Sequence, residues 1–382
     1  MKRTTAFLLT AAFAATLGFA AAVETEDAGA AAKAPRHVDL VICLDTSGSM
    51  QGLIESAKTK LWAVVNELAT ARPRPVLRVG LYQYGGSRLD PKAGWVEKMC
   101  DLTDDLDTVY GKLFALTAGG STEYVARVIR SGTLEQKWSG ESNALRIIFV
   151  AGNETAHQDK QYKLKDVCAA AAAKGIIINT IYCGQEAEGR STGWADAARW
   201  ADGRYAAIDQ NGGTVTITTP HDKKLAQLGT ELNKTYVAYG ANGRGGADNQ
   251  MLQDGNAAKL GVAVAAERAA GKANGLYRNS RWDLVDALKE NKVDLAKVKA
   301  EELPEEMRKM NPEQRKAHVE KQARRRAELQ TEIQSLNAKR GAYVKEQMAR
   351  QGLSDKKAFD AALRSAVHAQ AAKKGFKFQE AK

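Results

Sequence analysis

The most constraining feature of this chain is a series of short, almost continuously apolar segments that alternate with amphipathic helical patterns between about residues 38 and 238. The first segment, VDLVICLD (38–45), is too short for a helix and rich in branched residues, as expected of a strand buried on both faces. Similar segments follow at 76–85, 144–152 and 175–184. Apolar strands that alternate with helices predict an α/β domain with a doubly wound, mostly parallel sheet.

The sequence after this domain has a different character. GANGRGGADNQ (240–250) contains four glycines and no large apolar residue, which predicts a Gly-rich linker over residues 239–250. Only helical patterns follow, so residues 251–382 are predicted to form a basic helical region. Within it, Leu329, Ile333 and Leu336 recur at the spacing of a packing seam, which favours a coiled coil or a helical hairpin with 355–373 as the returning helix.

The N-terminus has the layout of an export signal. Lys2 and Arg3 precede an uncharged, apolar run that ends in small residues at Ala22, which predicts a cleaved signal peptide over 1–22 and a flexible lead-in over 23–37. No later stretch approaches the roughly 18 apolar residues of a membrane span. We therefore expect an exported bacterial protein, periplasmic or extracellular, with no transmembrane helix after signal cleavage.

The positive charge is unevenly distributed. The chain has 56 Lys and Arg against 45 Asp and Glu, and residues 241–382 hold 29 of the basic and 19 of the acidic residues, so nearly all of the net +11 lies there. Acidic residues interrupt its densest basic stretch, KAHVEKQARRRAELQ (316–330), and no recognition motif accompanies it, which disfavours nucleic acid as a partner. A solvated helical face is one interpretation, and an anionic envelope polymer or membrane surface is the other.

A candidate binding loop follows the first strand. The sequence DTSGSM places Asp45, Ser47 and Ser49 at the carboxyl end of that strand, where ligand sites of open parallel sheets form. A carboxylate and two hydroxyls are hard oxygen donors that suit Mg²⁺, Mn²⁺ or Ca²⁺. The alternative interpretation is an Asp N-cap followed by a Ser-rich turn before a helix.

Together, DTSGSM, the helix after it, GGST near residue 120 and the alternating strands and helices resemble a von Willebrand factor type A (VWA) domain over residues 38–238. The resemblance implies a Rossmann-like, six-stranded sheet with helices on both faces and a metal-ion-dependent adhesion site (MIDAS) on its upper edge. Asp45, Ser47 and Ser49 match the family's first motif, and Thr122 in GGST matches the Thr that follows its Gly pair.

The last element of the motif departs from the family pattern. Family members usually end the fourth strand with an Asp-Gly pair, whereas this strand ends in RIIFVAGNET and places Gly152 at the acidic position. Asn153 or Glu154 could reach an ion directly or through water. With Asp45 as the only certain charge, the ion would keep more of its positive charge and attract an external carboxylate more strongly. The alternative is a degenerate site held together by hydrogen bonds alone.

These features predict an exported, non-enzymatic protein-binding module of the adhesion or assembly type. A divalent cation, Mg²⁺ first with Mn²⁺ and Ca²⁺ as alternatives, would ligate an acidic side chain of an unknown protein partner. One alternative is a structural, envelope-associated protein with a degenerate metal site, whose basic region binds anionic polymers or lipid headgroups. An enzyme using the ion as a Lewis acid is disfavoured, because the assigned loops supply no general base or nucleophile and the chain has no hydrolase, nucleotide or zinc-protease motif. No catalytic residue is predicted.

Four cysteines remain to be placed. Export permits disulfides, but Cys43 is expected in mid-sheet and Cys100 on an edge strand, too far apart to pair. Cys168 and Cys183 lie on a consecutive helix and strand, and the sequence leaves that pair open.

Overall fold

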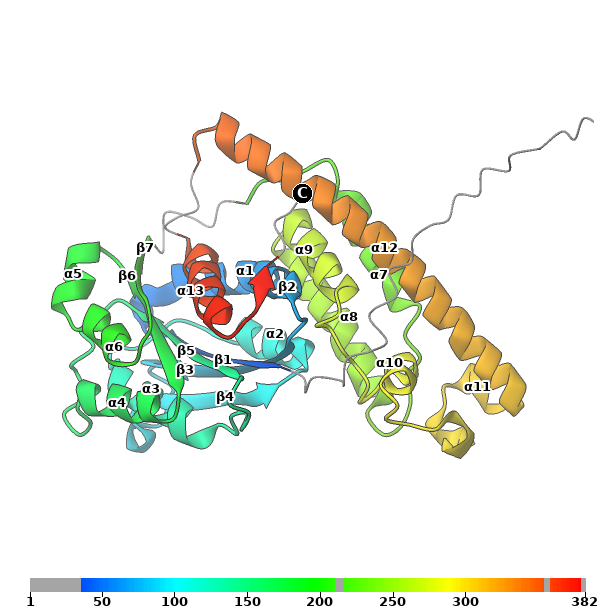
Figure 1. The fold of residues 1–382 in the computed structure, drawn as a ribbon, viewed down its shortest axis with the longest axis horizontal. Helices are drawn as coiled ribbons and strands as arrows, with labels where there is room; N and C mark the ends of the chain where they lie inside the picture. The colour runs from blue at the N-terminus through cyan, green and yellow to red at the C-terminus, as the bar shows by residue number, and fades with distance from the viewer. Residues whose placement is uncertain (1–35, 210–215, 354–357, 379–382) are drawn as a thin grey trace, which may run out of the picture. The chain divides into compact units, whose positions relative to one another are not determined.

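The computed structural model describes residues 36–209, 216–353 and 358–378 (Figure 1). The predicted signal peptide (1–22) and almost all of the lead-in (23–37) lie outside the described residues. None of the helices in the described part of the chain is both long enough and apolar enough to cross a membrane.

A six-stranded sheet carries the binding loop. Its strand order is β4-β3-β1-β5-β6-β7, and every neighbouring pair is parallel except β3 and β4, which are antiparallel. The doubly wound, mostly parallel sheet predicted from the apolar segments is therefore confirmed. The strands are β1 (His37–Asp45), β3 (Val76–Tyr84), β4 (Val96–Thr103), β5 (Leu145–Gly152), β6 (Ile176–Cys183) and β7 (Tyr205–Ile208).

Helices cover both faces of this sheet. Side chains alternate along β1, so that Leu40 and Ile42 enter one apolar cluster while Val41 and Cys43 enter another. The first cluster is covered by α1, α2 and α13, and the second by α3, α4 and α6. Their bounds are α1 (Gln51–Ala69), α2 (Leu106–Phe114), α3 (Val125–Glu135), α4 (Leu164–Ala173), α6 (Trp194–Trp200) and α13 (Phe359–Lys373), and α5 (Glu186–Ser191) packs beside α6.

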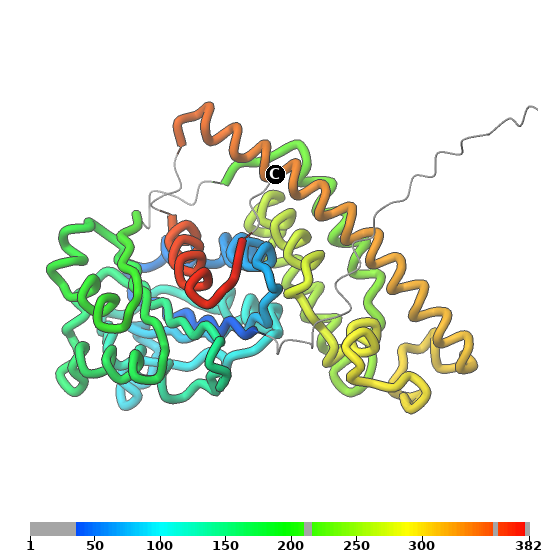
Figure 2. The backbone as a smooth tube through the Cα atoms, viewed as in Figure 1, coloured from blue at the N-terminus to red at the C-terminus, as the bar shows by residue number. Residues whose placement is uncertain are grey.

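The far end of the chain completes the sheet domain. Helix α13 packs against α1 (Figure 2). Its Leu363 and Val367 belong to the same apolar cluster as residues of β1. Two buried amides, Asn179 on β6 and Gln370 on α13, exchange hydrogen bonds of 3.0 and 2.7 Å. This domain is therefore made of two separate stretches of sequence.

A second, two-stranded sheet holds that closing segment in place. The short strand β8 (Lys377–Phe378) pairs antiparallel with β2 (Ala71–Arg72), which follows α1. Just before β1, the Arg36 guanidinium donates hydrogen bonds to the carbonyl oxygens of Lys374 and Gly375, each at 3.0 Å. The two ends of the described chain are thus joined at the same edge of the domain.

A helical region is inserted between β7 and α13. Helix α7 packs against α9 and α12, and α9 in turn packs against α1 and α8 (Figure 1). Its apolar contacts include Leu228 and Leu232 of α7, Ala270 of α9, and Leu329 and Ile333 of α12. The helices are α7 (Asp222–Asn233), α8 (Gly243–Lys259), α9 (Val262–Ala273), α10 (Leu284–Lys289), α11 (Glu305–Arg308) and α12 (Pro312–Arg350).

Three sequence expectations for this region differ from the structure. The sheet domain expected to reach residue 238 ends earlier, because α7 packs within the helical region. The expected linker at 239–250 is helical from Gly243 onward, as part of α8. Among the described residues, the seam of α12 faces α7 and α9, while the expected returning helix at 355–373 contains α13, which packs on α1 and the sheet. Between the described residues of α12 and α13, the predicted helical hairpin does not form.

The cysteines are all free thiols in this structure. Cys43, Cys168 and Cys183 are buried, and Cys100 is partly buried on β4. Cys168 and Cys183, the pair that the sequence left open, therefore form no disulfide in this structure.

Because α13 completes the core, we expect a substitution there to destabilise the sheet domain. Leu363→Ala removes a side chain that is 1% exposed and should lower the free energy of unfolding by about 2–5 kcal/mol. Lys373→Ala, on the exposed side of the same helix, should change it by no more than about 0.5 kcal/mol. Urea unfolding followed by circular dichroism measures both. Equal stability of the two variants would contradict the closing role of α13.

Candidate functional site

The candidate site begins where β1 ends. Asp45 is the last residue of β1, and its side chain is completely buried. One carboxylate oxygen, Oδ1, accepts a hydrogen bond of 2.7 Å from the backbone N–H of Ser47, which turns the chain sharply into the loop. The other oxygen, Oδ2, is buried without a hydrogen-bond partner. The loop then enters a short 3₁₀ helix (Gly48–Met50) that leads into α1.

Three further polar side chains are linked to this turn and to one another. The Ser47 and Ser49 hydroxyl oxygens lie 3.5 Å apart. The Asn153 side chain, one residue beyond β5, donates from Nδ2 to the Ser49 hydroxyl at 3.0 Å. Its amide oxygen, Oδ1, is also buried without a partner. The structure therefore brings Asp45, Ser47, Ser49 and Asn153 together through a continuous set of contacts.

The loop that carries Thr122 is fastened alongside. The Gly48 N–H donates to the Gly120 carbonyl oxygen at 3.0 Å, and the Gly119 N–H donates to the Thr46 carbonyl oxygen at 2.9 Å. Thr122 forms an isolated antiparallel bridge with Gly85 at the end of β3. Backbone contacts thus place the loop that carries Thr122 beside the Asp45 loop.

Glu154 occupies a different position. It is exposed, and its backbone carbonyl oxygen accepts a hydrogen bond of 2.7 Å from the Trp194 indole. Of the two alternatives left open by the sequence, Asn153 contacts the Ser49 hydroxyl, whereas Glu154 influences Asp45 only through its charge.

Gly152 shows why no acidic side chain stands at the end of β5. A Cβ atom on Gly152 would lie 2.5 Å from the Tyr84 hydroxyl oxygen, 3.0 Å from Asp45 Oδ2 and 3.1 Å from the Trp194 ring. The Tyr84 hydroxyl in turn donates to the Ala151 carbonyl oxygen at 2.9 Å. Aromatic side chains have filled the space that an aspartate would need.

A buried acidic residue that the motif did not reveal lies close by. Glu123 is 3% exposed, and Gln158 holds it by accepting from its backbone N–H at 3.2 Å and donating to its carboxylate at 2.9 Å. A Cβ on Gly85 would lie 2.9 Å from Asp45 Oδ1 and 3.2 Å from Glu123 Cγ, so these two acidic side chains flank Gly85. The only sequence signal for Glu123 as a site residue is its position directly after Thr122.

Burial dominates the electrostatics of the site. Loss of solvation raises the pKa of Asp45 to about 7, against the opposing effect of the Ser47 hydrogen bonds, and the charges of Glu123 and Glu154 raise it further. In the described residues no group of three or more His, Cys, Asp or Glu side chains is arranged to hold a metal. An ion here would depend on one carboxylate together with hydroxyl and amide oxygens, a donor set that suits a hard cation.

Residues 39–193 match the family model of the von Willebrand factor type A domain, so this part of the chain is a VWA domain. The match covers the strands, helices and loops that build the site, from Asp45 to Asn153. None of the curated proteins compared with the chain matches it.

Several solved structures share parts of this fold. Proximal thread matrix protein 1 from the mussel byssus, in a structure with a zinc-occupied MIDAS motif, is 12% identical, with a TM-score of 0.35 over 45% of this chain and 42% of that one. The SpRpn10 VWA domain is 14% identical, with a TM-score of 0.36 over 47% and 99%. The pilus adhesin SpaC from Lactobacillus rhamnosus GG is 13% identical, with a TM-score of 0.35 over 46% and 28%. This chain thus spans about two fifths of the length of the mussel protein.

We expect Gly152→Ala to destabilise the protein, because the new methyl group meets the Tyr84 hydroxyl. Overpacking of this kind costs about 1–3 kcal/mol of the free energy of unfolding. In a Tyr84→Phe background, which lacks that hydroxyl, the same substitution should cost less. Gly140→Ala, where a Cβ has no neighbour within 4 Å, is the control. Thermal or urea unfolding measures the free energy of unfolding of all these variants. An equal loss of stability from Gly152→Ala in both backgrounds would show that the Tyr84 hydroxyl does not fill the space beside Gly152.

The buried carboxylate also predicts a pH dependence in metal-free buffer. The pKa of Asp45 is about 7 in the folded protein and about 3.9 in an unfolded chain, so the folded state binds the extra proton between these values. The free energy of unfolding in EDTA should therefore fall as the pH rises through this window, by at most about 1.4 kcal/mol per pH unit. Asp45→Asn should remove this part of the slope. Parallel stability curves for the two proteins between about pH 4 and pH 7 would refute the assignment.

Proposed function

We propose that this chain is an exported, non-enzymatic protein-binding module whose VWA domain holds a divalent cation, Mg²⁺ first, and uses it to ligate an acidic side chain of a partner protein. Asp45, Ser47, Ser49 and Thr122 would hold the ion, and Asn153 would complete the set. Export rests on the signal-like sequence from Lys2 to Ala22.

One observation carries the proposal. Two oxygen atoms of the site, Asp45 Oδ2 and Asn153 Oδ1, are buried without any hydrogen-bond donor. Leaving such acceptors unsatisfied costs about 1–3 kcal/mol each, and more for a charged group. A hard cation would satisfy both oxygens at once, and it would stabilise the ionised form of Asp45.

The charge balance favours an acidic partner. Asp45 is the only carboxylate among the proposed ligands, so a divalent ion would keep about one unit of positive charge. Gly152 leaves no room for a second carboxylate at the end of β5, and the buried Glu123 carboxylate nearby is held by the Gln158 amide. An external carboxylate would supply the missing negative charge, which is why we propose an acidic side chain as the ligand.

Catalysis has no support from the surrounding groups. Cys183 is a buried thiol whose pKa is influenced by the charge of Asp45. Burial raises the pKa of this thiol, so it stays neutral. Among Asp45, Ser47, Ser49 and Asn153, the Asp45 carboxylate is the one group able to act as a base, and in this proposal the Ser47 N–H and the ion occupy it.

The alternative, in which the basic helical region binds an anionic surface, is weakened by where its charges lie. Arg268, Lys272, Arg326 and Arg340 are buried and pair with acidic residues of the protein itself. Part of the positive charge concentrated in this region therefore stabilises the fold and is not available to a surface.

Calorimetric titration with Mg²⁺, Mn²⁺ and Ca²⁺ tests the metal site. We expect one ion per chain, with an affinity that falls about tenfold or more in Asp45→Asn, because the substitution removes the only ligating charge while keeping the shape. Asp101→Asn, which removes an exposed carboxylate on β4, should leave the affinity unchanged. Absence of heat with all three ions would overturn the proposal.

The same variants test the partner. A protein captured by wild type in the presence of Mg²⁺ should be released by EDTA and should not be captured by Asp45→Asn. Capture that persists in EDTA would assign binding to another surface.

A further inference from the structure

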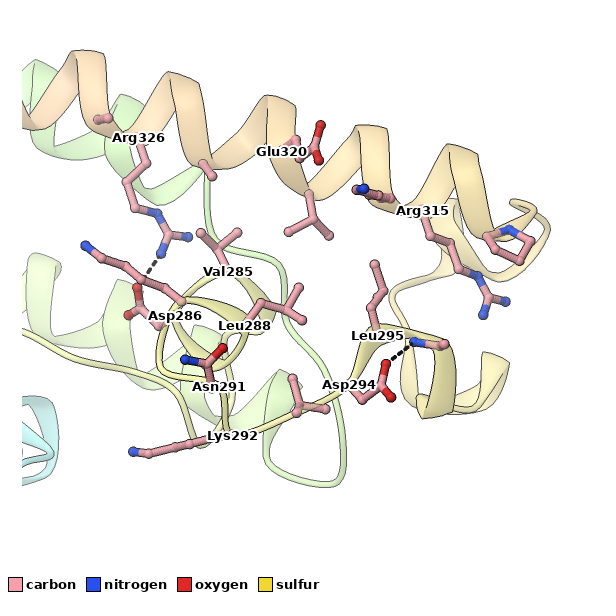
Figure 3. A pocket seen from close by; sticks show the side chains of 18 of the residues that line it. Val285, Asp286, Leu288, Asn291, Lys292, Asp294, Leu295, Arg315, Glu320 and Arg326 are labelled. Atoms are coloured by element: carbon pink, nitrogen blue, oxygen red, sulfur yellow. Dashed lines mark hydrogen bonds and ion pairs between the residues drawn. The ribbon is translucent and has the colours of Figure 1, made fainter.

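A large cavity lies in the inserted helical region, away from the Asp45 site. It has a volume of about 1010 Å³ and lies between the first half of α12 and the segment that runs from α10 to the short 3₁₀ helix η3 (Leu295–Lys297) (Figure 3). Sites for small organic ligands usually measure about 300–1,000 Å³. This cavity is therefore large enough for an extended small molecule.

Its walls are apolar on both sides. Val285, Leu288 and Leu295 point into the cavity from the lower side in Figure 3, and Val319 and Ala323 of α12 line the opposite side. Leu288, Leu295 and Ala323 are only partly buried by the protein itself. A hydrocarbon group placed there would cover this surface and gain about 25 cal/mol for each Å² of apolar area removed from water.

An arginine marks each end of this apolar wall, but the two differ (Figure 3). At one end the Arg326 guanidinium is satisfied by ion pairs with Asp283 at 2.7 Å and Asp286 at 2.9 Å. At the other end Arg315 Nε is buried without a partner, and one Nη makes only a long hydrogen bond, 3.4 Å, to the Arg308 carbonyl oxygen. A buried guanidinium N–H without an acceptor is costly, so this end of the cavity favours an anion.

Basic side chains outnumber acidic ones among the other unpaired charges at the cavity, where Glu320 is the one carboxylate without an ion pair among the described residues. Lys289 and Lys316 line it and have no ion-pair partner among the described residues. The Asp294 carboxylate is already used, since it accepts from the Ala296 N–H at 3.1 Å and lies 3.4 Å from the Lys297 ammonium. The unpaired charge around the cavity is therefore mainly positive.

We propose that this cavity binds a single-chain anionic amphiphile, a long-chain fatty acid, with its hydrocarbon chain between α10 and α12 and its carboxylate at Arg315. The two arginines are eleven residues apart on α12, which corresponds to about 16 Å along the helix. That length suits an extended acyl chain. Neither the VWA domain nor a metal ion is needed for this binding.

Displacement of a dansyl-labelled fatty acid from the full chain, purified without detergent, tests the proposal. Palmitate should displace the label saturably at one molecule per chain, whereas butyrate should not, because it lacks the hydrocarbon chain. Hexadecanol, with the same chain and no charge, should bind about tenfold more weakly or worse than palmitate, because its neutral hydroxyl cannot form an ion pair with Arg315.

Variants locate the ligand. Arg315→Gln should weaken palmitate about tenfold while leaving hexadecanol unchanged. Ala323→Trp should fill the cavity and abolish binding of both. Arg324→Gln removes an exposed charge from the same helix outside the cavity and should bind palmitate as wild type does. Circular dichroism and urea unfolding check that each variant is folded.

Any of the following results would overturn the proposal. The first is the absence of saturable displacement by palmitate. The second is equal affinity for palmitate and hexadecanol, or unchanged binding by Ala323→Trp. The third is self-association that Ala323→Trp abolishes in the absence of any fatty acid, which would assign the cavity to a second copy of the chain.

Discussion

A buried ion pair between Arg268 and Asp107 joins the inserted helices to the sheet domain. The Arg268 guanidinium on α9 donates to the Asp107 carboxylate on α2 at 2.8 Å, binds Asp254 on α8, and lies 4.8 Å from the centre of the Trp62 ring on α1. The Tyr277 hydroxyl donates to the second Asp107 oxygen at 2.5 Å. Burying a charge is tolerable only with full pairing, and losing one partner of such a pair costs about 3–5 kcal/mol. The pairing therefore fixes how α8 and α9 sit against α1 and α2, and through α9 it positions α7 and α12 as well.

Much of the sheet domain could be predicted from the sequence, because strands buried on both faces leave an unambiguous apolar pattern. The expected strand at 38–45 corresponds to β1 at His37–Asp45. The helical region was harder to predict, because glycine occurs both in flexible linkers and in helices that pack closely against a neighbour. In α8 a Cβ on Gly246 would lie 2.3 Å from the Trp282 ring, so this glycine permits close packing of a helix, although the sequence reads as a flexible linker. The apolar face of α13 predicts a helix but does not indicate which element packs against that face. The element is α1, some three hundred residues earlier in the chain.

The site was predictable to the extent that its geometry is local. Asp45, Ser47 and Ser49 lie within five residues, so a single turn brings their oxygens together. The contributions of Gly152 and Glu123 depend on residues far away in the sequence: Tyr84 and Trp194 occupy the space beside Gly152, and Gln158 holds Glu123. The sequence around Gly152 does not show that a carboxylate is excluded there, and the sequence around Glu123 does not show that its carboxylate is buried. The interpretation of Asp45 as a simple helix cap is not supported, since its carboxylate stabilises the turn at Ser47 and precedes α1 by a 3₁₀ helix.

The closing helix has a consequence for how the chain acquires its structure. The hydrogen bond between Arg36 and Gly375 joins residues 339 positions apart, and the sheet domain lacks part of its core until α13 arrives. Contacts of such separation are slow to form, because the entropy of closing the loop is lost before the contact is gained. A ribosome must release nearly the entire chain before the domain can close. Delayed closure of this kind lengthens the time after synthesis during which the sheet domain exposes the apolar surface that α13 later covers.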